Sequence, residues 1–306
     1  MKLIKLLSVA LLLVSLPFLS CAAEGRKIIA FAQDNMANDF RKAQVYEVRD
    51  AVAKHPELSF VYSDAEGHTA LLIHQIEQFI EQKVDLIVLG TNDEKAVVPV
   101  IAKAYKSGIP VIVLDRGIKG KAYTTFINSD NIKIGALGAE YISKRLQGKG
   151  LVLLLEGLQT ADVTLLRSKG FLDEIGKYKG IKVIKRTGNY LRKDALSEME
   201  KLVADGIQVD AIFSESDSML SGVRMVLEKN KIDYGSIVMV GCDFTSEAKQ
   251  AISQGTQSGS VLFPLGGNKS VEIALKIFAG NKVPKHIFIP VKLVTKENVE
   301  EVTPIF

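Results

Sequence analysis

The chain has 306 residues, of which 47% are hydrophobic and 24% are charged, and its formal net charge is +4. This is the composition of a soluble globular protein that is long enough for two domains, each with its own core, and it excludes a disordered or fibrous chain. The sequence contains no block of like charges and no aromatic-basic patch, so a nucleic-acid partner is not predicted.

The N-terminus has the pattern of a secretory signal. Lys2 and Lys5 precede an apolar run over 6–19, and the small residues Ser20-Cys21-Ala22-Ala23 follow. This order predicts a signal peptide over 1–23 and export to the periplasm. Removal of the signal peptide, which contains Lys2 and Lys5, lowers the net charge to about +2. The apolar run is interrupted by Pro17 and is too short for a membrane-spanning helix.

Two fates of Cys21 are open at this stage. It is either the lipid-bearing first residue of a bacterial lipoprotein or a residue removed by a cut after Ala23. We favour a free periplasmic protein, because strand-like sequence begins at Lys27 and leaves almost no tether. Cys242 is then the sole cysteine, so no disulfide can form within the chain, and we expect it to be a small buried hydrophobe.

Short aliphatic runs alternate with amphipathic segments after the signal. Strands are predicted over 27–33, 58–62, 85–90 and 110–114, as near-continuous apolar runs typical of buried parallel sheets. The clearest helix between them carries one apolar stripe, formed by Leu72, Ile73, Ile76, Phe79 and Ile80.

A second series of the same kind begins after Asn128. Strands are predicted over 151–155, 182–184, 211–214 and 237–241, with helices near 161–178, 194–205 and 218–229. Two successive series of alternating strands and helices predict an α/β fold with two doubly wound parallel-sheet (Rossmann-like) lobes. No low-complexity linker separates the two series, so the lobes are expected to lie close together.

Polar residues follow almost every predicted strand. Ligands of doubly wound sheets bind outside the carboxyl ends of the strands, where loops diverge and helix N-termini point inward. Each residue alone has a structural alternative: Asn38, Asp39 or Asp93 can cap a helix, and Asp115 with Arg116 can form a local ion pair. Their concentration at the strand ends favours a ligand site in a cleft between the lobes. The polar positions are Gln33, Asp34, Asn35, Asn38, Asp39, Thr91, Asn92, Asp93, Asp115, Arg116, the segments 156–160 and 214–217, and Asp243.

Signatures of catalysis are absent from the sequence. His55, His68, His74 and His286 have no metal-ligand spacing and fall on predicted helices or loops, where we expect surface or packing roles. There is no nucleophile elbow, phosphate-binding loop or cysteine–histidine arrangement, and the pair Gly266-Gly267 is predicted to be a turn before a helix. No enzyme, metal site or cofactor is therefore predicted.

Several segments resemble a known family when they are read in order. They are IPVIVLDR (109–116), FINSDN (126–131), LEG (155–157), RSKGF (167–171), AIFSESDSM (211–219) and VGCD (240–243). In this order and spacing, behind a signal peptide, the chain resembles the ribose-binding-protein-like periplasmic sugar-binding proteins over its whole mature length. Repressors of the same fold carry an N-terminal helix-turn-helix where this chain has a signal sequence, so transcriptional repression is excluded.

The resemblance implies a type I periplasmic binding protein fold with a three-stranded hinge. Crossings between the lobes are expected near 127–130, 259–262 and 289–291, which gives an N-terminal lobe of 24–128 plus 262–289 and a C-terminal lobe of 129–261 plus 290–306. The helix near 269–279 then returns to the first lobe. The resemblance also implies hinge closure around a sugar, with an ABC permease and its ATPase as partners. The alternative is a sensory protein that presents its closed form to a chemoreceptor or sensor-kinase ectodomain.

The resemblance also implies a set of ligand-binding residues. Asp115 and Arg116 match the family's Asp-Arg pair, and Phe40 and Tyr190 match its aromatic faces. The sequence departs from ribose binders at Arg41, Leu165 and Ser216, so a related pentose, a furanose, a hexose or a modified sugar is expected as readily as ribose. The full set of candidate residues is Asp34, Asn38, Phe40, Arg41, Asp115, Arg116, Arg167, Tyr190, Ser216, Asp217, Asp243 and Phe263.

Overall fold

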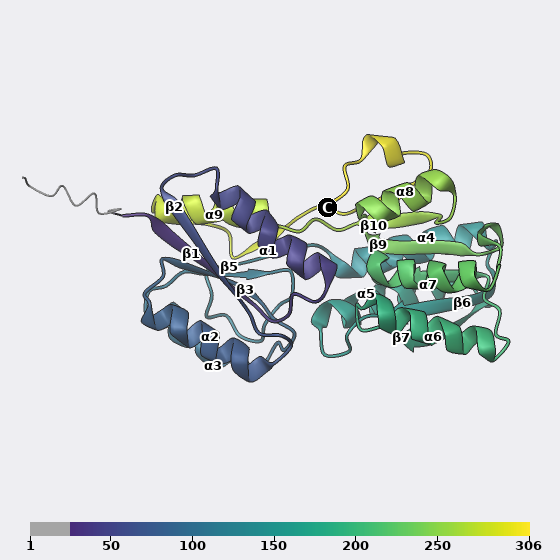
Figure 1. Ribbon diagram of the computed structural model, residues 1–306, viewed down its shortest axis with the longest axis horizontal. Coiled ribbons are helices and arrows are strands. Elements are labelled where there is room, and N and C mark those ends of the chain that lie inside the picture. Colours follow the sequence, from purple (N-terminus) through teal and green to yellow (C-terminus); the bar gives the residue numbers. More distant parts are fainter. Residues whose placement is uncertain (1–24) are drawn as a thin grey trace, which may run out of the picture.

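The computed structural model describes residues 25–306, which form two α/β lobes side by side (Figure 1). The predicted signal peptide and Cys21 lie outside the described residues. Over residues 25–306, no helix has both the length and the apolar character that a membrane crossing requires.

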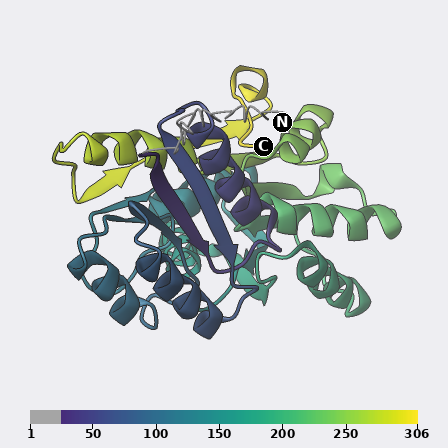
Figure 2. The same cartoon turned by 60° about the vertical axis from the view of Figure 1, so that its left-hand side comes forward.

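The first lobe is built on a parallel sheet of order β11-β5-β4-β3-β1-β2. Helices α1 and α9 cover one face, and α2 and α3 cover the other (Figure 2). Because both faces are covered, the inner strands are apolar throughout, which is the pattern seen in the sequence. The elements are β1 (Lys27–Gln33), α1 (Asp39–Val52), β2 (Leu58–Asp64), α2 (Thr69–Glu81), β3 (Leu86–Gly90), α3 (Val98–Lys106), β4 (Val111–Leu114), β5 (Thr125–Asn128), α9 (Gly267–Phe278) and β11 (His286–Phe288).

The second lobe has a sheet of order β12-β10-β9-β8-β6-β7, in which only β12 pairs antiparallel to its neighbour within the described residues. Helices α4 and α5 pack on one face, and α6 and α7 pack on the other. The elements are α4 (Asn131–Arg145), β6 (Lys149–Glu156), α5 (Asp162–Ile175), β7 (Gly180–Thr187), α6 (Arg192–Ala204), β8 (Ala211–Ser214), α7 (Asp217–Lys229), η1 (Tyr234–Ser236), β9 (Val238–Asp243), α8 (Ser246–Gln254), β10 (Gly259–Leu262), β12 (Lys292–Thr295) and η2 (Val299–Glu301).

Three chain segments connect the lobes. The first joins β5 to α4, the second joins β10 to α9, and the third joins β11 to β12. Residues 259–262, near which the second crossing was expected, form β10 and pair with β9 along their whole length, so the chain leaves the second sheet only after Leu262. Helix α9 then packs against α1 in the first lobe.

Helices α4 and α5 touch through two glycines. A Cβ atom built on Gly135 would lie 2.0 Å from the carbonyl oxygen of Arg167, and one on Gly170 would lie 2.0 Å from that of Ile132. No side chain fits at either position, so the two backbones meet directly. This contact fixes the position of α5 along α4, and therefore the position of Arg167 at the cleft.

The predicted fold class is confirmed, and so are the buried stripe of α2 and the buried position of Cys242 in β9. The surface or packing role expected for His286 is confirmed, but its placement on a helix or loop is wrong. This residue lies in strand β11, where its ring stacks on Phe126 at 5.0 Å and its Nε2 is 2.6 Å from Asn128 Oδ1. His286 therefore packs at the first crossing between the lobes.

Candidate ligand-binding site

A small cavity, called here the inner cavity, lies between the two lobes at the carboxyl ends of both sheets. All predicted site residues except Asp34 and Asp217 border it. The first lobe contributes the start of α1 and the end of β4, and the second lobe contributes α5, the loop after β7, the start of α7 and the end of β9. The lining residues are Asn38, Phe40, Arg41, Asp115, Arg116, Val163, Arg167, Tyr190, Ser216, Asp243 and Phe263.

Four charged side chains of the first lobe are buried together beside this cavity. Arg41 Nη2 lies 2.9 Å from Asp115 Oδ2, and Arg116 Nη1 lies 3.8 Å from Asp34 Oδ2. Asp115 and Arg116 thus pair with other residues rather than with each other, and the alternative of a local ion pair is wrong. Gln44 Oε1 accepts a further hydrogen bond from Arg41 Nη1 at 3.1 Å.

This cluster keeps hydrogen-bonding capacity that residues 25–306 do not use. Asp115 Oδ1, Arg116 Nε and both carboxylate oxygens of Asp34 are buried and make no hydrogen bond of ordinary geometry within residues 25–306. Burial raises the pKa of Asp34 and lowers the pKa of Arg116, because each charge loses its hydration. Buried polar groups of this kind cost free energy unless a partner is supplied, so these atoms are suited to a polar ligand.

In the second lobe, Arg167 is held in one orientation by two hydrogen bonds. Its Nε donates to Asn131 Oδ1 at 2.8 Å, and its Nη1 donates to the carbonyl oxygen of Glu215 at 2.7 Å. Asp243 lies opposite the first-lobe cluster, and burial raises the pKa of its carboxyl group well above the ordinary value although the charge of Arg167 partly offsets this. The second lobe therefore presents a fixed donor and a buried carboxyl group.

Aromatic rings form further walls of the inner cavity. Phe40 and Phe263 stack at 5.0 Å, and the guanidinium of Arg167 lies 4.5 Å from the centroid of the Phe263 ring. The ring of Tyr190 faces the guanidinium of Arg116 at 5.4 Å. The cavity thus combines flat apolar surfaces with charged donors and acceptors, which is the usual composition of a small-molecule site.

Glu215 was not singled out from the sequence as a functional residue. It is fully buried, and its carboxylate accepts hydrogen bonds from Gly157 N at 2.9 Å, from Ser168 Oγ at 2.8 Å and from the hydroxyl of Tyr190 at 3.3 Å. Burial raises the pKa of Glu215 to about 7. Glu215 thus holds the hydroxyl group of Tyr190 in place. In the sequence, the only signal for this role was the position of Glu215 at the polar end of a strand.

Three cavity residues occupy the left-handed backbone region. The φ angles are 66° at Asp115, 61° at Tyr190 and 108° at Asp243. Residues with side chains rarely adopt these angles, and such strain tends to gather at functional sites. Here the unusual angles occur where the chain turns out of β4, in the loop after β7 and at the end of β9.

The predicted site residue Asp217 and the family departure Leu165 lie outside the inner cavity. The carboxylate of Asp217 instead accepts hydrogen bonds from Phe244 N and Ser260 Oγ at 2.7 Å and from Gln257 Nε2 at 2.9 Å. It organises the second lobe internally. Leu165 is 58% exposed, so the family departure at this position faces solvent.

Other strand-end residues cap helices or turns. Asn38 Oδ1 accepts from Arg41 N at 3.1 Å, and Ser216 Oγ accepts from Met219 N at 3.2 Å, although both residues also border the inner cavity. Asp93 Oδ1 accepts from Ala96 N at 2.9 Å, which agrees with its capping alternative.

A second cavity, the outer cavity, adjoins the inner one and has an empty volume of about 710 Å³. Asn38, Arg41, Arg116 and Tyr190 border both cavities, and Asp34 borders only the outer one. The predicted residue Asp34 therefore belongs to the same cleft but not to its inner end.

Hydrogen bonds hold the lobes together around this cleft. Asn38 Nδ2 donates to the carbonyl oxygen of Tyr190 at 2.7 Å, and Gly117 N donates to Asp162 Oδ2 at 2.8 Å. Each bond joins one lobe to the other. The structure is therefore a closed form, and Asp162, which the sequence did not single out, is one of its closing contacts.

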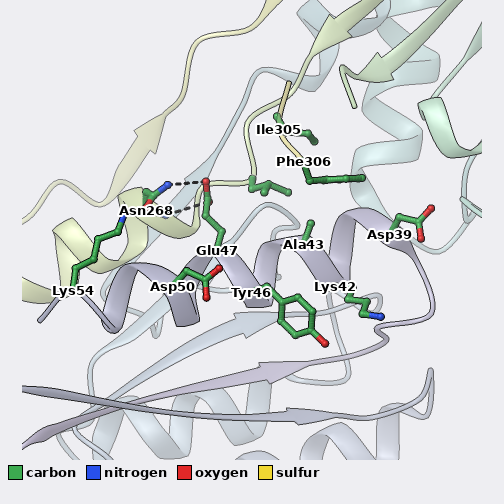
Figure 3. A pocket seen from close by; sticks show the side chains of 11 residues that line it. Asp39, Lys42, Ala43, Tyr46, Glu47, Asp50, Lys54, Asn268, Ile305 and Phe306 are labelled. Carbon is green, nitrogen blue, oxygen red and sulfur yellow. Dashed lines mark hydrogen bonds between the residues drawn. The ribbon is translucent and has the colours of Figure 1, made fainter. Parts of the chain in front are cut away.

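A larger groove of about 950 Å³ runs along α1 outside the cleft, between the N-terminus of α9 and the C-terminal residues (Figure 3). It is open, and the carboxylate of Glu47 in its wall already accepts hydrogen bonds from Gly267 N and Asn268 N. Its lining lacks the buried, unpartnered polar atoms of the cleft. Among residues 25–306, no cluster of three or more side chains is suited to hold a metal ion.

Comparison with known proteins agrees with the geometry. A family model described as "Periplasmic binding protein domain" matches residues 29–282. The ribose import binding protein RbsB of Bacillus subtilis is 30% identical over 248 residues, which cover 80% of each chain, and the galactofuranose-binding protein YtfQ of Escherichia coli is 26% identical over 81% of this chain and 80% of its own.

A solved structure also superimposes over nearly the whole chain. It is an ABC transporter solute-binding protein of Bacillus halodurans C-125 with bound myo-inositol, with a TM-score of 0.85, 27% identity, and coverage of 92% of this chain and 98% of that chain. The predicted resemblance is thus confirmed: the chain belongs to the periplasmic binding protein family, with the type I fold and the ribose-binding proteins among its relatives.

Proposed function

We propose that this protein binds a sugar in the inner cavity by closure of its two lobes. The observation that carries this proposal is the set of buried, unpartnered polar atoms on Asp115 and Arg116, which face Arg167 and Asp243 of the other lobe across the cavity. A sugar loses water from several hydroxyl groups on burial, and each must regain a donor or acceptor. Carboxylates and guanidinium groups supply both.

The aromatic walls fit the same class of ligand. One side of a sugar ring exposes C–H groups, and the faces of Phe40 and Tyr190 offer apolar surface for them. Ribose, galactofuranose and xylitol, the ligands named for three relatives, are small neutral polyhydroxy compounds, and another relative is named "Putative rhizopine-binding protein". Arg41 and Ser216 depart from ribose binders and border the cavity, so the proposed ligand class includes a related pentose, a furanose, a hexose or a modified sugar beside ribose.

The proposed role is that of the periplasmic component of an ABC importer, without catalysis. A relative that matches 80% of this chain is a ribose import binding protein. The contacts across the cleft fit a protein that closes around its ligand before delivering it. Stimulation of the partner permease's ATPase by the liganded protein would support import, whereas activation of a sensor kinase without such stimulation would support the sensory alternative.

A thermal-shift screen against pentoses, hexoses and their furanose forms tests the proposal, because a ligand that binds only the folded state raises its melting temperature. We expect at least one sugar to raise the melting temperature of the native protein and of an Asp93→Asn control, whose carboxylate only caps a turn. The same sugar should have no effect on Arg116→Gln. If no sugar shifts the native protein, or if the bound sugar is converted to a product, the proposed function is wrong.

A further inference from the structure

Two buried amide side chains lie behind the inner cavity, one in each lobe. Gln44 in α1 and Asn131 at the start of α4 are 0% and 3% exposed, and neither borders the inner or the outer cavity. Each amide accepts a hydrogen bond from an arginine that does border the inner cavity, and each donates a hydrogen bond to the backbone of a segment that crosses between the lobes. These amides can therefore act on a bound sugar only through the arginines.

In the first lobe, Gln44 connects Arg41 to the second crossing. Gln44 Oε1 accepts from Arg41 Nη1 at 3.1 Å, and Gln44 Nε2 donates to the carbonyl oxygen of Leu265 at 2.8 Å. Leu265 lies between β10 and α9, in the segment 263–266. Within the described chain, the bond to Gln44 is the one side-chain hydrogen bond of ordinary geometry that Arg41 makes, because Nη2 is close to Asp115 but poorly aligned with it.

In the second lobe, Asn131 connects Arg167 to the first crossing. Asn131 Oδ1 accepts from Arg167 Nε at 2.8 Å, and Asn131 Nδ2 donates to the carbonyl oxygen of Ser129 at 3.2 Å. Ser129 is buried and lies between β5 and α4. The two lobes thus use the same arrangement, in which a buried amide joins a cavity arginine to a carbonyl group of a crossing.

This arrangement requires a side chain that accepts and donates at once. An arginine N–H only donates and a backbone carbonyl only accepts, so the group between them must do both, and the orientation of the amide is fixed. A carboxylate would place an acceptor against the carbonyl oxygen. An aliphatic side chain would leave an N–H and a carbonyl group buried without partners, which costs free energy.

Gln44 also determines how Arg41 meets Asp115. Guanidinium and carboxylate groups often form a bidentate pair with two parallel hydrogen bonds. Here Arg41 Nη1 is bound by Gln44, Arg41 Nη2 approaches Asp115 Oδ2, and Asp115 Oδ1 stays without a partner in residues 25–306. Without Gln44, Nη1 would be free to turn toward Oδ1 and to compete with a sugar hydroxyl for it.

We propose that Gln44 and Asn131 are positioning residues of the sugar site. They hold Arg41 and Arg167 in the orientations in which the arginines and Asp115 meet the hydroxyl groups of a bound sugar. Because the anchoring carbonyl groups belong to the crossings, the arginines are oriented by the same segments about which the lobes close. This inference rests on the proposed function, because it assumes a sugar in the inner cavity.

Isothermal titration calorimetry with deoxy sugars tests this inference in Gln44→Met and Asn131→Leu, which keep the approximate side-chain volume and remove both hydrogen bonds of each amide. The probes are D-ribose, L-arabinose, D-galactose and D-fructose, each with its monodeoxy derivatives. The ratio of the affinities for a sugar and its deoxy derivative, called here the hydroxyl penalty, measures what one hydroxyl contributes to binding.

A positioning role changes this ratio at one hydroxyl, whereas a purely structural role weakens all the sugars alike and leaves every ratio unchanged. We expect Gln44→Met to lower the hydroxyl penalty about fivefold at one hydroxyl, the difference between a hydrogen bond to a charged group and one to a neutral group. Asn131→Leu should do the same at a different hydroxyl, because Arg167 belongs to the other lobe.

Gln75→Met and Asn298→Leu are the matched controls. The Gln75 amide in α2 donates to a backbone carbonyl at 2.8 Å, and the Asn298 amide accepts from one backbone N–H and donates to one carbonyl. Neither residue borders the inner cavity, so both controls should keep every hydroxyl penalty. If a test variant does not fold, Gln44→Asn or Asn131→Ser replaces it, since neither shorter side chain reaches both partners.

The outcomes separate the two proposals. If sugars bind and both variants leave every hydroxyl penalty within twofold of its native value, the amides serve the fold alone; the inference is then refuted and the proposed function stands. If only one variant shows the local change, the inference is refuted for the amide of the other lobe. If no sugar binds the native protein, both proposals fail.

Discussion

Replacing Asp115 with asparagine is the sharpest test of the inner cavity. Asparagine keeps the volume of the side chain and one acceptor oxygen, and it tolerates the left-handed backbone at this position, where φ is 66°. Alanine would add backbone strain to the loss of the carboxylate. The substitution therefore removes the charge of Asp115 with the least change elsewhere.

The expected loss of affinity follows from the contacts of Asp115. One oxygen is 2.9 Å from Arg41 Nη2 and the other has no partner in the described chain, so the second is free to accept a ligand hydroxyl. A hydrogen bond to a charged group contributes roughly 1.5 to 3 kcal/mol, and every 1.4 kcal/mol is tenfold in affinity. We expect Asp115→Asn to weaken sugar binding by about 10- to 150-fold.

The same change also affects the unliganded protein. Arg41 is 2% exposed and would lose its carboxylate partner, although Gln44 remains bonded to it. We expect the free energy of unfolding to fall by about 2 kcal/mol, within the range for a buried group left without its partner. Asp93→Asn is the matched control, because it removes an aspartate at another strand end whose carboxylate only caps a turn.

Calorimetry at 25 °C with the best sugar from the thermal-shift screen measures the effect on binding, and urea denaturation measures the effect on stability. An affinity within twofold of that of the native protein, in a folded Asp115→Asn variant, would refute the assignment of Asp115 as a ligand acceptor. A loss of the same size in Asp93→Asn would show that the effect is general and not local to the cavity.

Three further predictions concern closure, pH and packing. Asp162→Ala removes the acceptor of the bond from Gly117 N, and we expect sugar affinity to fall by about 5- to 30-fold while small-angle scattering shows a more open unliganded form. Because burial raises the pKa of Glu215 from 4.5 to about 7, the native state holds this proton more strongly than the unfolded state does. The contribution of protonated Glu215 to the free energy of unfolding is complete below about pH 4.5 and is lost as the pH rises to about 7, a decrease of up to about 3 kcal/mol. Glu215→Gln should flatten this decrease when urea denaturation is measured at several pH values. Gly135→Ala places a Cβ atom on the carbonyl of Arg167, so we expect a loss of more than about 2 kcal/mol in unfolding free energy together with weaker sugar binding, whereas an unchanged affinity would show that α5 does not need this contact to position Arg167.

Most of the fold is predictable from the sequence because the central strands of both sheets are buried on both faces. Their apolar runs are long enough to distinguish them from the helical stripes between them. The edge strands are harder to find. β11 has three residues and exposes the first and last of them, so its pattern gives no strand signal, and His286 was placed on a loop or helix for this reason.

The sequence predicts which strand ends form the candidate site, but it does not predict which side chains pair with one another there. Asp115 and Arg116 are neighbours in sequence, which suggests that they pair with each other, whereas the turn after β4 separates them and each meets a partner that lies far away along the chain. Asp217 shows the reverse case. Its position at a strand end resembles that of a ligand residue, but Gln257 and Ser260 use its carboxylate within the lobe, and no spacing rule reveals that.

The backbone at Asp115 and Asp243 restricts how the ligand preference of this protein can be changed by mutation. Positive φ angles admit glycine, asparagine and aspartate with little strain, and most other residues with a penalty. A random library at these two positions would therefore consist largely of destabilised variants, whatever their effect on binding. Arg41 and Ser216 border the same cavity with ordinary backbone angles, so substitutions there add no backbone strain, and their cost comes from the lost ion pair with Asp115 and the lost cap of α7.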